Sequence, residues 1–153
     1  MDTTGFFDYP TEPEARSEHG LPGFLSDRGD EDWAMLLDHT ETRLFVPGEV
    51  VLRQGERDRA LYLLVMGWVK APSGVVHPIT TLGEGAFLDG APRAVSIEAM
   101  SEGEMLRLGF DGFEALAARN PALGRDILLD VGRILSARMA CQALTGMRLG
   151  IWV

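Results

Sequence analysis

The sequence predicts a mainly β fold, a double-stranded β-roll of the jelly-roll type with a short helix before it and a long helix after it. Between residues 42 and 108, short runs of β-branched, aromatic and other apolar residues alternate with turns that contain glycine or proline. Residues 30–39 and 120–145 instead carry apolar residues at helical spacing. Many short strands between two helical ends favour a closed roll over a sheet with alternating strands and helices.

The first helix is expected to begin at Asp30, which suits an N-cap, and to run through His39. Its apolar face contains Trp33, Leu36 and Leu37. The strands follow as short runs separated by turn residues. These runs are residues 42–46, 50–53, 60–66, 68–71, 75–82, 86–88, 95–99 and 105–108.

The end of the chain is predicted to be helical. A short amphipathic segment starts at Asp111, and Asn120 followed by Pro121 is a strong start signal for a long helix that ends near Gly146. Its apolar residues form two stripes, of which one can pack on the roll. We expect the other to join two copies in a homodimer through residues 120–145. The first stripe is Leu123, Ile127 and Ile134, and the second is Leu128, Val131, Leu135 and Met139.

The sequence of 153 residues divides into three parts. Residues 1–22 are expected to form a flexible acidic arm, residues 23–146 a single domain, and residues 147–153 an apolar tail. Of the formal net charge of −9, residues 1–32 carry −7, so the rest of the chain is nearly neutral. A nearly neutral body lacks the positive surface that binds a phosphate backbone, and we expect no direct DNA binding.

Targeting signals are missing from the sequence. The longest apolar run, residues 60–69, is shorter than the ~20 residues that cross a bilayer. The first residues have neither the basic start nor the long apolar core of a secretory signal. We therefore expect a cytoplasmic protein that makes no membrane contact.

Patterns for catalysis and metal binding are also missing. His19, His39 and His77 lack the spacing that converges on one ion, so a metal or haem protein of the cupin-like class is a remote alternative and no metal site is expected. A single cysteine, Cys141, excludes an intrachain disulfide and a cysteine zinc cage. Because no nucleophile elbow or phosphate-binding P-loop appears either, we expect no enzyme.

Six segments occur in order along the chain: FVPGE (45–49), LRQGE (52–56), LYLLVMGWVK (61–70), LGEGAF (82–87), PRAVS (92–96) and the helix that contains LGRDIL (123–128). Together they resemble the cyclic-nucleotide-binding domain family in its CRP/FNR-like β-roll form. The resemblance covers about residues 24–140 and implies a regulatory β-roll with a short phosphate-binding cassette. Transcription regulators of this family continue into a helix-turn-helix that binds DNA. We do not expect one after Gly146, so the domain should transmit its regulatory signal to an unidentified protein partner.

The cassette comprises residues 82–96. In ligand-binding members of the family, the cassette resembles a pattern of Phe-Gly-Glu, then a short helix, then Pro-Arg-x-Ala followed by Thr or Ser. The resemblance implies that the glutamate binds the ribose hydroxyl and that helix amides and the arginine bind the phosphate. Arg93 and Ser96 match the arginine and hydroxyl positions, but Gly90 occupies the glutamate slot and Asp89 the glycine slot. The intervening segment is several residues shorter than the family pattern, which leaves no room for the cassette helix.

Two cassette residues have two interpretations each. Asp89 either replaces the ribose carboxylate after a slip of one residue or caps a tight Asp-Gly turn, and the turn is favoured. Arg93 is either an exposed or salt-bridged arginine at a strand entrance or an anion-binding residue. The candidate ligand-binding residues are Arg93, Ser96, Asp89, Gly90, Ala91, Phe87 and Leu88.

Two functions fit these patterns. The first is a stand-alone regulatory or scaffold domain that acts through protein–protein contacts, with cyclic-nucleotide binding lost and no cofactor. The alternative is a genuine receptor for cAMP or cGMP in which Arg93 binds the phosphate. An arginine without the carboxylate and the amides would bind phosphate weakly and with little selectivity for the sugar.

Overall fold

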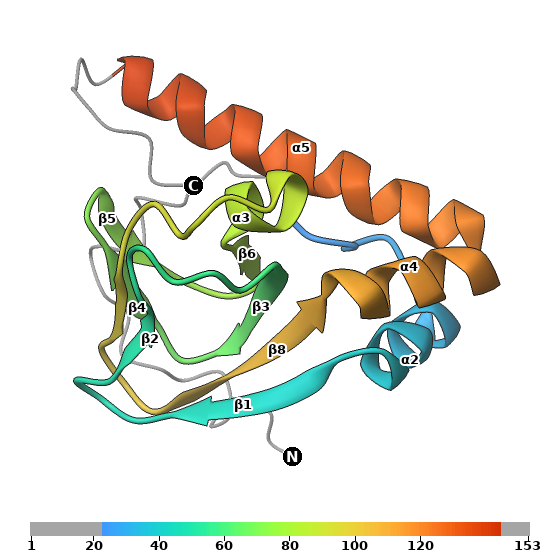
Figure 1. The fold of residues 1–153 in the computed structure, drawn as a ribbon, viewed down its shortest axis with the longest axis horizontal. Coiled ribbons are helices and arrows are strands. Elements are labelled where there is room, and N and C mark those ends of the chain that lie inside the picture. Colours follow the sequence, from blue (N-terminus) through green and yellow to red (C-terminus); the bar gives the residue numbers. More distant parts are fainter. Residues whose placement is uncertain (1–22, 145–153) are drawn as a thin grey trace.

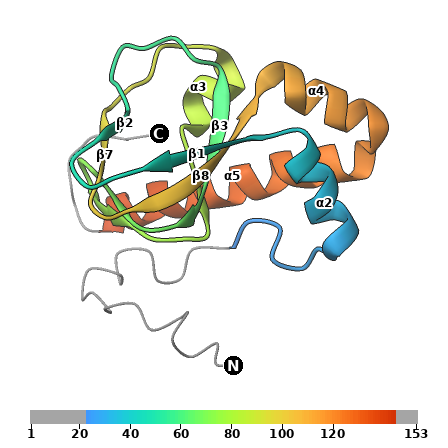
Figure 2. The same cartoon turned by 90° about the horizontal axis from the view of Figure 1, so that it is seen from below.

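The computed structural model describes residues 23–144, so the expected arm and tail lie outside the described part of the chain. Two antiparallel sheets form the predicted β-roll, α2 and α4 gather at one end of it, and α5 runs along its length (Figures 1 and 2). The helices are α2 (Asp30–Asp38), α3 (Glu84–Asp89), α4 (Phe110–Arg119) and α5 (Pro121–Leu144). The strands are β1 (Glu41–Phe45), β2 (Val50–Leu52), β3 (Ala60–Met66), β4 (Val69–Ala71), β5 (Gly74–Val76), β6 (Thr80–Leu82), β7 (Ile97–Ala99) and β8 (Gly103–Gly109).

One sheet has the strand order β1-β8-β3-β6 and the other β2-β7-β4-β5. The central strand β3 is apolar at consecutive positions because both of its faces are covered. Leu61 and Leu63 pack in the core between the roll and the helices, whereas Tyr62 and Leu64 pack in the core inside the roll. The two cores therefore meet at this strand, which also begins next to the cassette.

The long helix packs on the roll through one buried stripe. The composition of this stripe differs from the one predicted at Val131. Val131, which the sequence analysis assigned to the dimer stripe, is 0% exposed. Residues 127, 131 and 134 are spaced four and three apart, so they share one helix face. Leu128 and Met139 are exposed at 41% and 46%, and Leu135 is half-buried. The buried stripe contains Leu123, Ile127, Val131 and Ile134.

Other boundaries differ from the predictions over short segments. The predicted strand over residues 86–88 is part of helix α3, because Gly83 and Gly90 adopt left-handed conformations and enclose a single helical segment. Such a short apolar run does not distinguish a strand from a helix by its periodicity. The run over residues 75–82 forms two strands, β5 and β6. The expected cap of α5 is confirmed, since Asn120 Oδ1 accepts a hydrogen bond from the backbone of Leu123 at 3.1 Å.

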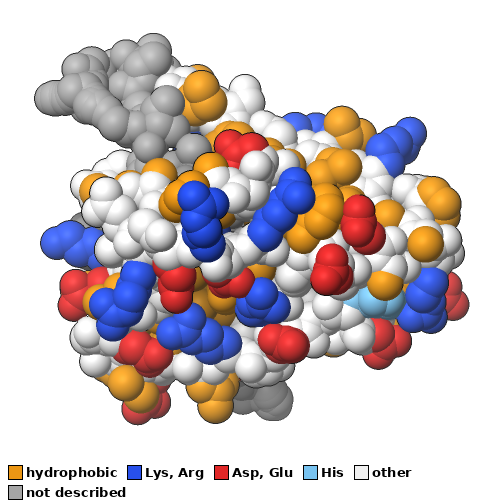
Figure 3. Space-filling model, viewed as in Figure 1, with side chains coloured by type: hydrophobic (Ala, Val, Ile, Leu, Met, Phe, Trp, Pro, Cys, Tyr) orange, Lys and Arg blue, Asp and Glu red, His pale blue; other side chains and the backbone are white. Residues whose placement is uncertain are grey.

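Among residues 23–144, the structure contains no helix with both the length and the apolar character needed to span a bilayer. Basic and acidic side chains are interspersed over the roll on the face seen in Figure 3. This face does not present one continuous surface of positive charge.

Candidate functional site

The cassette folds around Arg93, whose guanidinium points into the protein. Arg93 is only 4% exposed. Its Nη1 donates to the carbonyl oxygen of Gly83 at 3.1 Å, and its Nη2 donates to the carbonyl oxygens of Asp58 and Ala60 at 2.8 and 3.0 Å. Arg93 therefore joins the start of α3 to the start of β3 through backbone acceptors.

Gly83 makes this position of Arg93 possible. It precedes α3 in the left-handed region, with φ of 78°. A Cβ atom at this position would collide with the Arg93 guanidinium. The glycine thus serves both the turn and the close approach of the arginine.

The carboxylate of Asp58 is the anionic partner of Arg93, and sequence analysis did not single it out. Its Oδ2 accepts a hydrogen bond from the Tyr62 hydroxyl at 2.6 Å and lies 3.4 Å from Arg93 Nη2. Its Oδ1 accepts a hydrogen bond from Arg107 Nη2 at 2.7 Å. The side chain of Asp58 is 22% exposed, so this cluster reaches the surface.

The electrostatics of the cluster favour an ionised Asp58. Burial by itself raises the pKa of the carboxyl. Hydrogen bonds from Arg107 and Tyr62, together with the charges of Arg107 and Arg93, outweigh burial and lower the pKa below its ordinary value. Burial, followed by the hydrogen bond to Asp58, raises the pKa of Tyr62, so the phenol remains a donor at neutral pH.

The other candidate ligand-binding residues do not converge on Arg93. Asp89 Oδ1 accepts a hydrogen bond from the backbone of Ala91 at 2.8 Å, the geometry of the turn interpretation. Ser96 is exposed, and its Oγ accepts a hydrogen bond from the backbone of Gln54 at 2.9 Å. Asp89 therefore closes a local turn, whereas Ser96 joins the cassette to the loop between β2 and β3.

The two apolar candidates of the cassette point in different directions, and both belong to helix α3. Phe87 is buried in the core beside the helices, whereas Leu88 is 40% exposed. The family pattern of Gly-Glu, a short helix and Pro-Arg fits Gly83-Glu84, α3 and Pro92-Arg93. The expected placement of Gly90 in the glutamate slot and Asp89 in the glycine slot is therefore wrong, and Glu84 occupies the glutamate slot. The expectation that the cassette has no room for its helix is therefore wrong, because α3 is that helix.

A second buried arginine fixes the long helix to the roll. Arg138 of α5 is 3% exposed, and its Nη1 donates to Glu84 Oε2 at 2.7 Å. Its Nη2 donates to the hydroxyl of Thr80 at 3.0 Å and to the carbonyl oxygen of Thr81 at 2.9 Å. Glu84 is 0% exposed and also accepts a hydrogen bond from the Thr81 hydroxyl. This ion pair joins α5 to β6 and to the start of α3.

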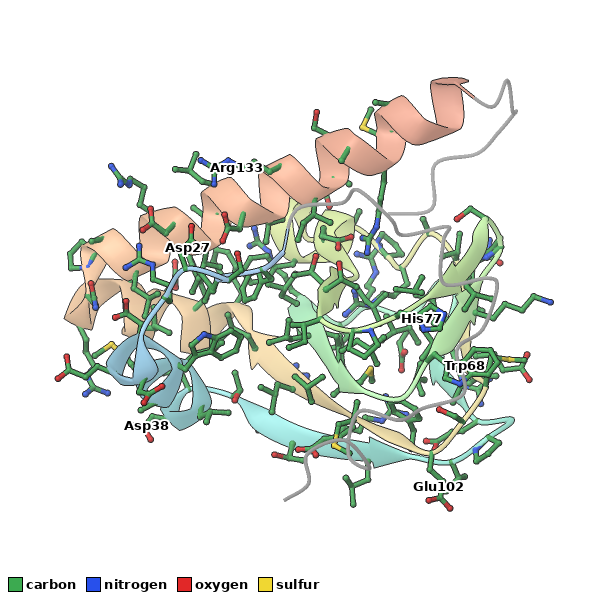
Figure 4. The ribbon with its side chains drawn as sticks, turned by 180° about the vertical axis from the view of Figure 1, so that it is seen from behind. Asp27, Asp38, Trp68, His77, Glu102 and Arg133 are labelled. Carbon is green, nitrogen blue, oxygen red and sulfur yellow. The ribbon has the colours of Figure 1, made fainter. Side chains whose placement is uncertain are left out.

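The two histidines in residues 23–144, His39 and His77, occupy separate positions. His77 stacks on Trp68 at one end of the roll, with ring centroids 5.8 Å apart and planes 13° apart (Figure 4). His39 Nδ1 lies 2.8 Å from the carbonyl oxygen of Met35 in α2. No group of three His, Cys, Asp or Glu side chains in the described part of the chain could hold a metal ion.

Comparison with known proteins gives one family. A model described as the cyclic nucleotide-binding domain matches residues 42–120, more than half of the chain. A cAMP-dependent protein kinase regulatory subunit of Emericella nidulans is 37% identical over 90 residues, which cover 54% of this chain and 22% of that protein. One of Yarrowia lipolytica is 33% identical over 99 residues, which cover 60% of this chain and 26% of that protein. The chain thus spans about a quarter of the length of these relatives.

Solved structures share the fold. The catabolite activator protein of Thermus thermophilus has a TM-score of 0.65 and 25% identity, over 80% of this chain and 62% of that chain. A cyclic nucleotide-binding domain of Methylobacillus flagellatus has a TM-score of 0.72 and 22% identity, over 92% of this chain and 85% of that chain. With the family model covering the roll and its cassette, these matches establish that the chain belongs to the cyclic nucleotide-binding domain family.

Proposed function

We propose that this chain is a regulatory domain that has lost cyclic-nucleotide binding and acts through protein–protein contacts. Its position within the family and its resemblance to kinase regulatory subunits support a regulatory role over a catalytic one. In this proposal the domain is cytoplasmic, works without a cofactor and transmits its signal to a protein partner.

The single observation that carries the proposal is the internal use of Arg93. Its guanidinium is buried against three carbonyl oxygens and one carboxylate of the same chain. A nucleotide phosphate would have to displace these acceptors from Arg93, and the carboxylate in the glutamate slot, Glu84, is already paired with Arg138. The loss of two hydrogen bonds to charged groups costs about 3–6 kcal/mol, or roughly two to four orders of magnitude in affinity.

The ion pair between Arg138 and Glu84 gives further support. It holds α5 on the roll with contacts that the chain supplies itself. A helix already fixed in this way requires no nucleotide to dock. The domain then serves as a constant surface for a partner.

We propose, in addition, that the domain forms a homodimer through the outward face of α5. Leu128, Leu135 and Met139 lie along this face at helical spacing, and Gly132 between them leaves open space for an approaching helix. Apolar side chains that repeat along an exposed helix face favour helix-to-helix association. A second copy would cover them.

Calorimetric titration of the wild-type chain with cAMP and cGMP tests the loss of nucleotide binding. We expect no saturable heat up to about 1 mM nucleotide. Saturable binding near the micromolar level would overturn the proposal in favour of the receptor alternative. In that case Arg93→Lys should weaken binding, because lysine cannot form the fork of hydrogen bonds, whereas Arg57→Lys at an exposed neighbouring position should not.

A further inference from the structure

An exposed apolar groove lies at the end of the roll away from α2 and α4. It has a volume of about 570 Å³ and is formed by the end of β1, the end of β3 and the start of β8. Three of its apolar side chains face solvent, since Leu44, Val46 and Met66 are 70%, 56% and 38% exposed. Contiguous exposed apolar surface with a polar rim is typical of a protein interaction site.

Part of the lining of this groove is backbone that leaves no room for a side chain. Gly67 has a φ of 84°, and a Cβ atom there would collide with the carbonyl oxygen of Glu102. A Cβ atom on Gly103 would collide with the carbonyl oxygen of Met66 and with the ring of Phe45. The shape of the groove is therefore set before a partner arrives, which lowers the entropy cost of binding.

The charged side chains of the groove are all acidic. Its lining contains Glu102 and Glu104 and no lysine, arginine or histidine. Within residues 23–144, neither carboxylate forms an ion pair. Figure 4 shows Glu102 at this end of the roll, with its side chain directed away from the strands. A basic group on a partner could therefore pair with either carboxylate.

The strand register places one of these carboxylates between two apolar side chains. Glu104 of β8 lies opposite Leu44 of β1 on one side and opposite Met66 of β3 on the other. Directly opposed residues of neighbouring strands project from the same face of a sheet. The row thus presents an apolar, an acidic and an apolar side chain next to one another. A complementary segment carries a basic side chain between two apolar ones.

The negative charge separates the possible occupants of the groove. Membrane surfaces rich in anionic lipids and nucleic acids would be repelled by the two carboxylates. Residues 1–22 contain five acidic residues against Arg16, a net charge of −4, so they would be repelled as well. A protein segment with a basic side chain between apolar ones gains from both the charge and the apolar surface of the groove.

We propose that this groove is the docking surface for the partner protein, and that it binds a segment in which an arginine or lysine lies between apolar side chains. This inference rests on the proposed action through protein–protein contacts and names the chemistry of the partner. Leu44 should contribute most to binding, because its side chain is the most exposed of the apolar ones in the groove and has the most area to bury.

Fluorescence anisotropy of a labelled peptide tests the proposal on the full chain. The probe contains Leu-Ser-Arg-Ser-Leu, which places both leucines and the arginine on one face of an extended peptide. The reference peptide has glutamate in place of the arginine. The wild type should bind the probe saturably, with a Kd below about 1 mM, and the reference at least about tenfold more weakly. Leu44→Asp should weaken binding of the probe at least about tenfold. Leu37→Asp, the matched change at a 51% exposed leucine of α2, should leave it unchanged.

A charge-reversed variant completes the test. Glu102→Lys with Glu104→Lys should exchange the preference, so that this variant binds the glutamate peptide more tightly than the arginine peptide. If the wild type binds neither peptide or both equally, or if Leu44→Asp binds the probe as well as the wild type does, the docking proposal is wrong. A smaller mass of Leu44→Asp in light scattering would show that a second copy covers the groove, and would also overturn the proposal. Titration of the wild type with cAMP decides the proposed loss of nucleotide binding separately, because the peptide measurement contains no nucleotide.

Discussion

Two buried arginines, Arg138 and Arg93, have similar exposure but different partners. Arg138 pairs with Glu84, which is 0% exposed and enclosed between α5 and β6. Arg93 pairs with Asp58, whose side chain is 22% exposed and shared with a third arginine, Arg107. The first ion pair is closed to solvent and the second borders it.

The difference shows how one chain uses buried charge for two purposes. A fully buried pair is costly to form and more costly to break, so it holds two elements in one arrangement. A pair at the surface can exchange its anion for another one from solution. The ion pair of Arg138 is therefore closed within the structure, while that of Arg93 is open to solvent on the side of Asp58.

The largest expected effect is that of Arg138→Ala. It leaves the carboxylate of Glu84 buried without its cation, which should lower the free energy of unfolding by about 3–5 kcal/mol. Urea unfolding measures this change. Arg133→Ala is the control on the same helix, because Arg133 projects away from the roll (Figure 4), is 61% exposed and contacts Asp130.

The control should change stability by less than about 0.5 kcal/mol, as is usual for an exposed ion pair. A double variant, Glu84→Leu with Arg138→Met, should be more stable than Arg138→Ala alone, because it leaves no unpaired charge. If Arg138→Ala and Arg133→Ala destabilise the protein equally, the contrast between the two arginine sites does not hold.

A smaller, pH-dependent effect is expected of Asp58→Asn. The pKa of Asp58 in the folded protein is lower than its ordinary value of 3.8, so the ionised carboxylate stabilises the fold above that value. This contribution, about 1 kcal/mol for a partly exposed group, should be lost as the pH falls through the lowered pKa. Unfolding free energies of wild type and variant should therefore differ by a constant amount near neutral pH and converge in acid.

The matched control in this series is Glu41→Gln. The carboxylate of Glu41 is exposed and forms an ion pair with the same Arg107. Its effect should be small at every pH. A difference between wild type and Asp58→Asn that grows as the pH falls would contradict the assigned direction of the pKa change.

The smallest effect on stability is expected on the opposite face of α5. Leu128→Glu with Met139→Glu alters exposed residues, so stability should change by less than about 0.5 kcal/mol while the homodimer dissociates. Light scattering measures the mass. Leu129→Glu is the control, since Leu129 is 45% exposed but lies off the proposed stripe, and it should remain dimeric. A wild-type monomer at tens of micromolar would refute this interface.

The sequence predicted the architecture because its signals are local. Alternating apolar runs, turn glycines and the Asn120-Pro121 start signal gave the roll and the long helix that the structure contains. The segment over residues 86–88 was assigned to the wrong element because three residues carry too little periodicity. Val131 was assigned to the wrong stripe because neighbouring helix faces differ by one position.

The charged partners were harder to predict because they are joined only by the fold. Glu84 and Arg138 lie 54 positions apart in the sequence, and Asp58 and Arg93 lie 35 apart. One signal was available: Arg138 continues the buried stripe of Ile134, so a charge on that face implied a buried partner. For Asp58, in a polar turn before β3, no local pattern distinguished it from its charged neighbours.

The short loop between α3 and Arg93 determines how much conformational entropy a ligand could remove. Asp89 caps the turn through the amide of Ala91, Pro92 restricts its own backbone, and the backbone of Arg93 donates to the carbonyl oxygen of Glu56 at 2.9 Å. Ordering a free residue costs about 1–2 kcal/mol of backbone entropy, and here the fold has already met that cost. A ligand that contacts this loop would therefore lose little binding free energy to ordering it.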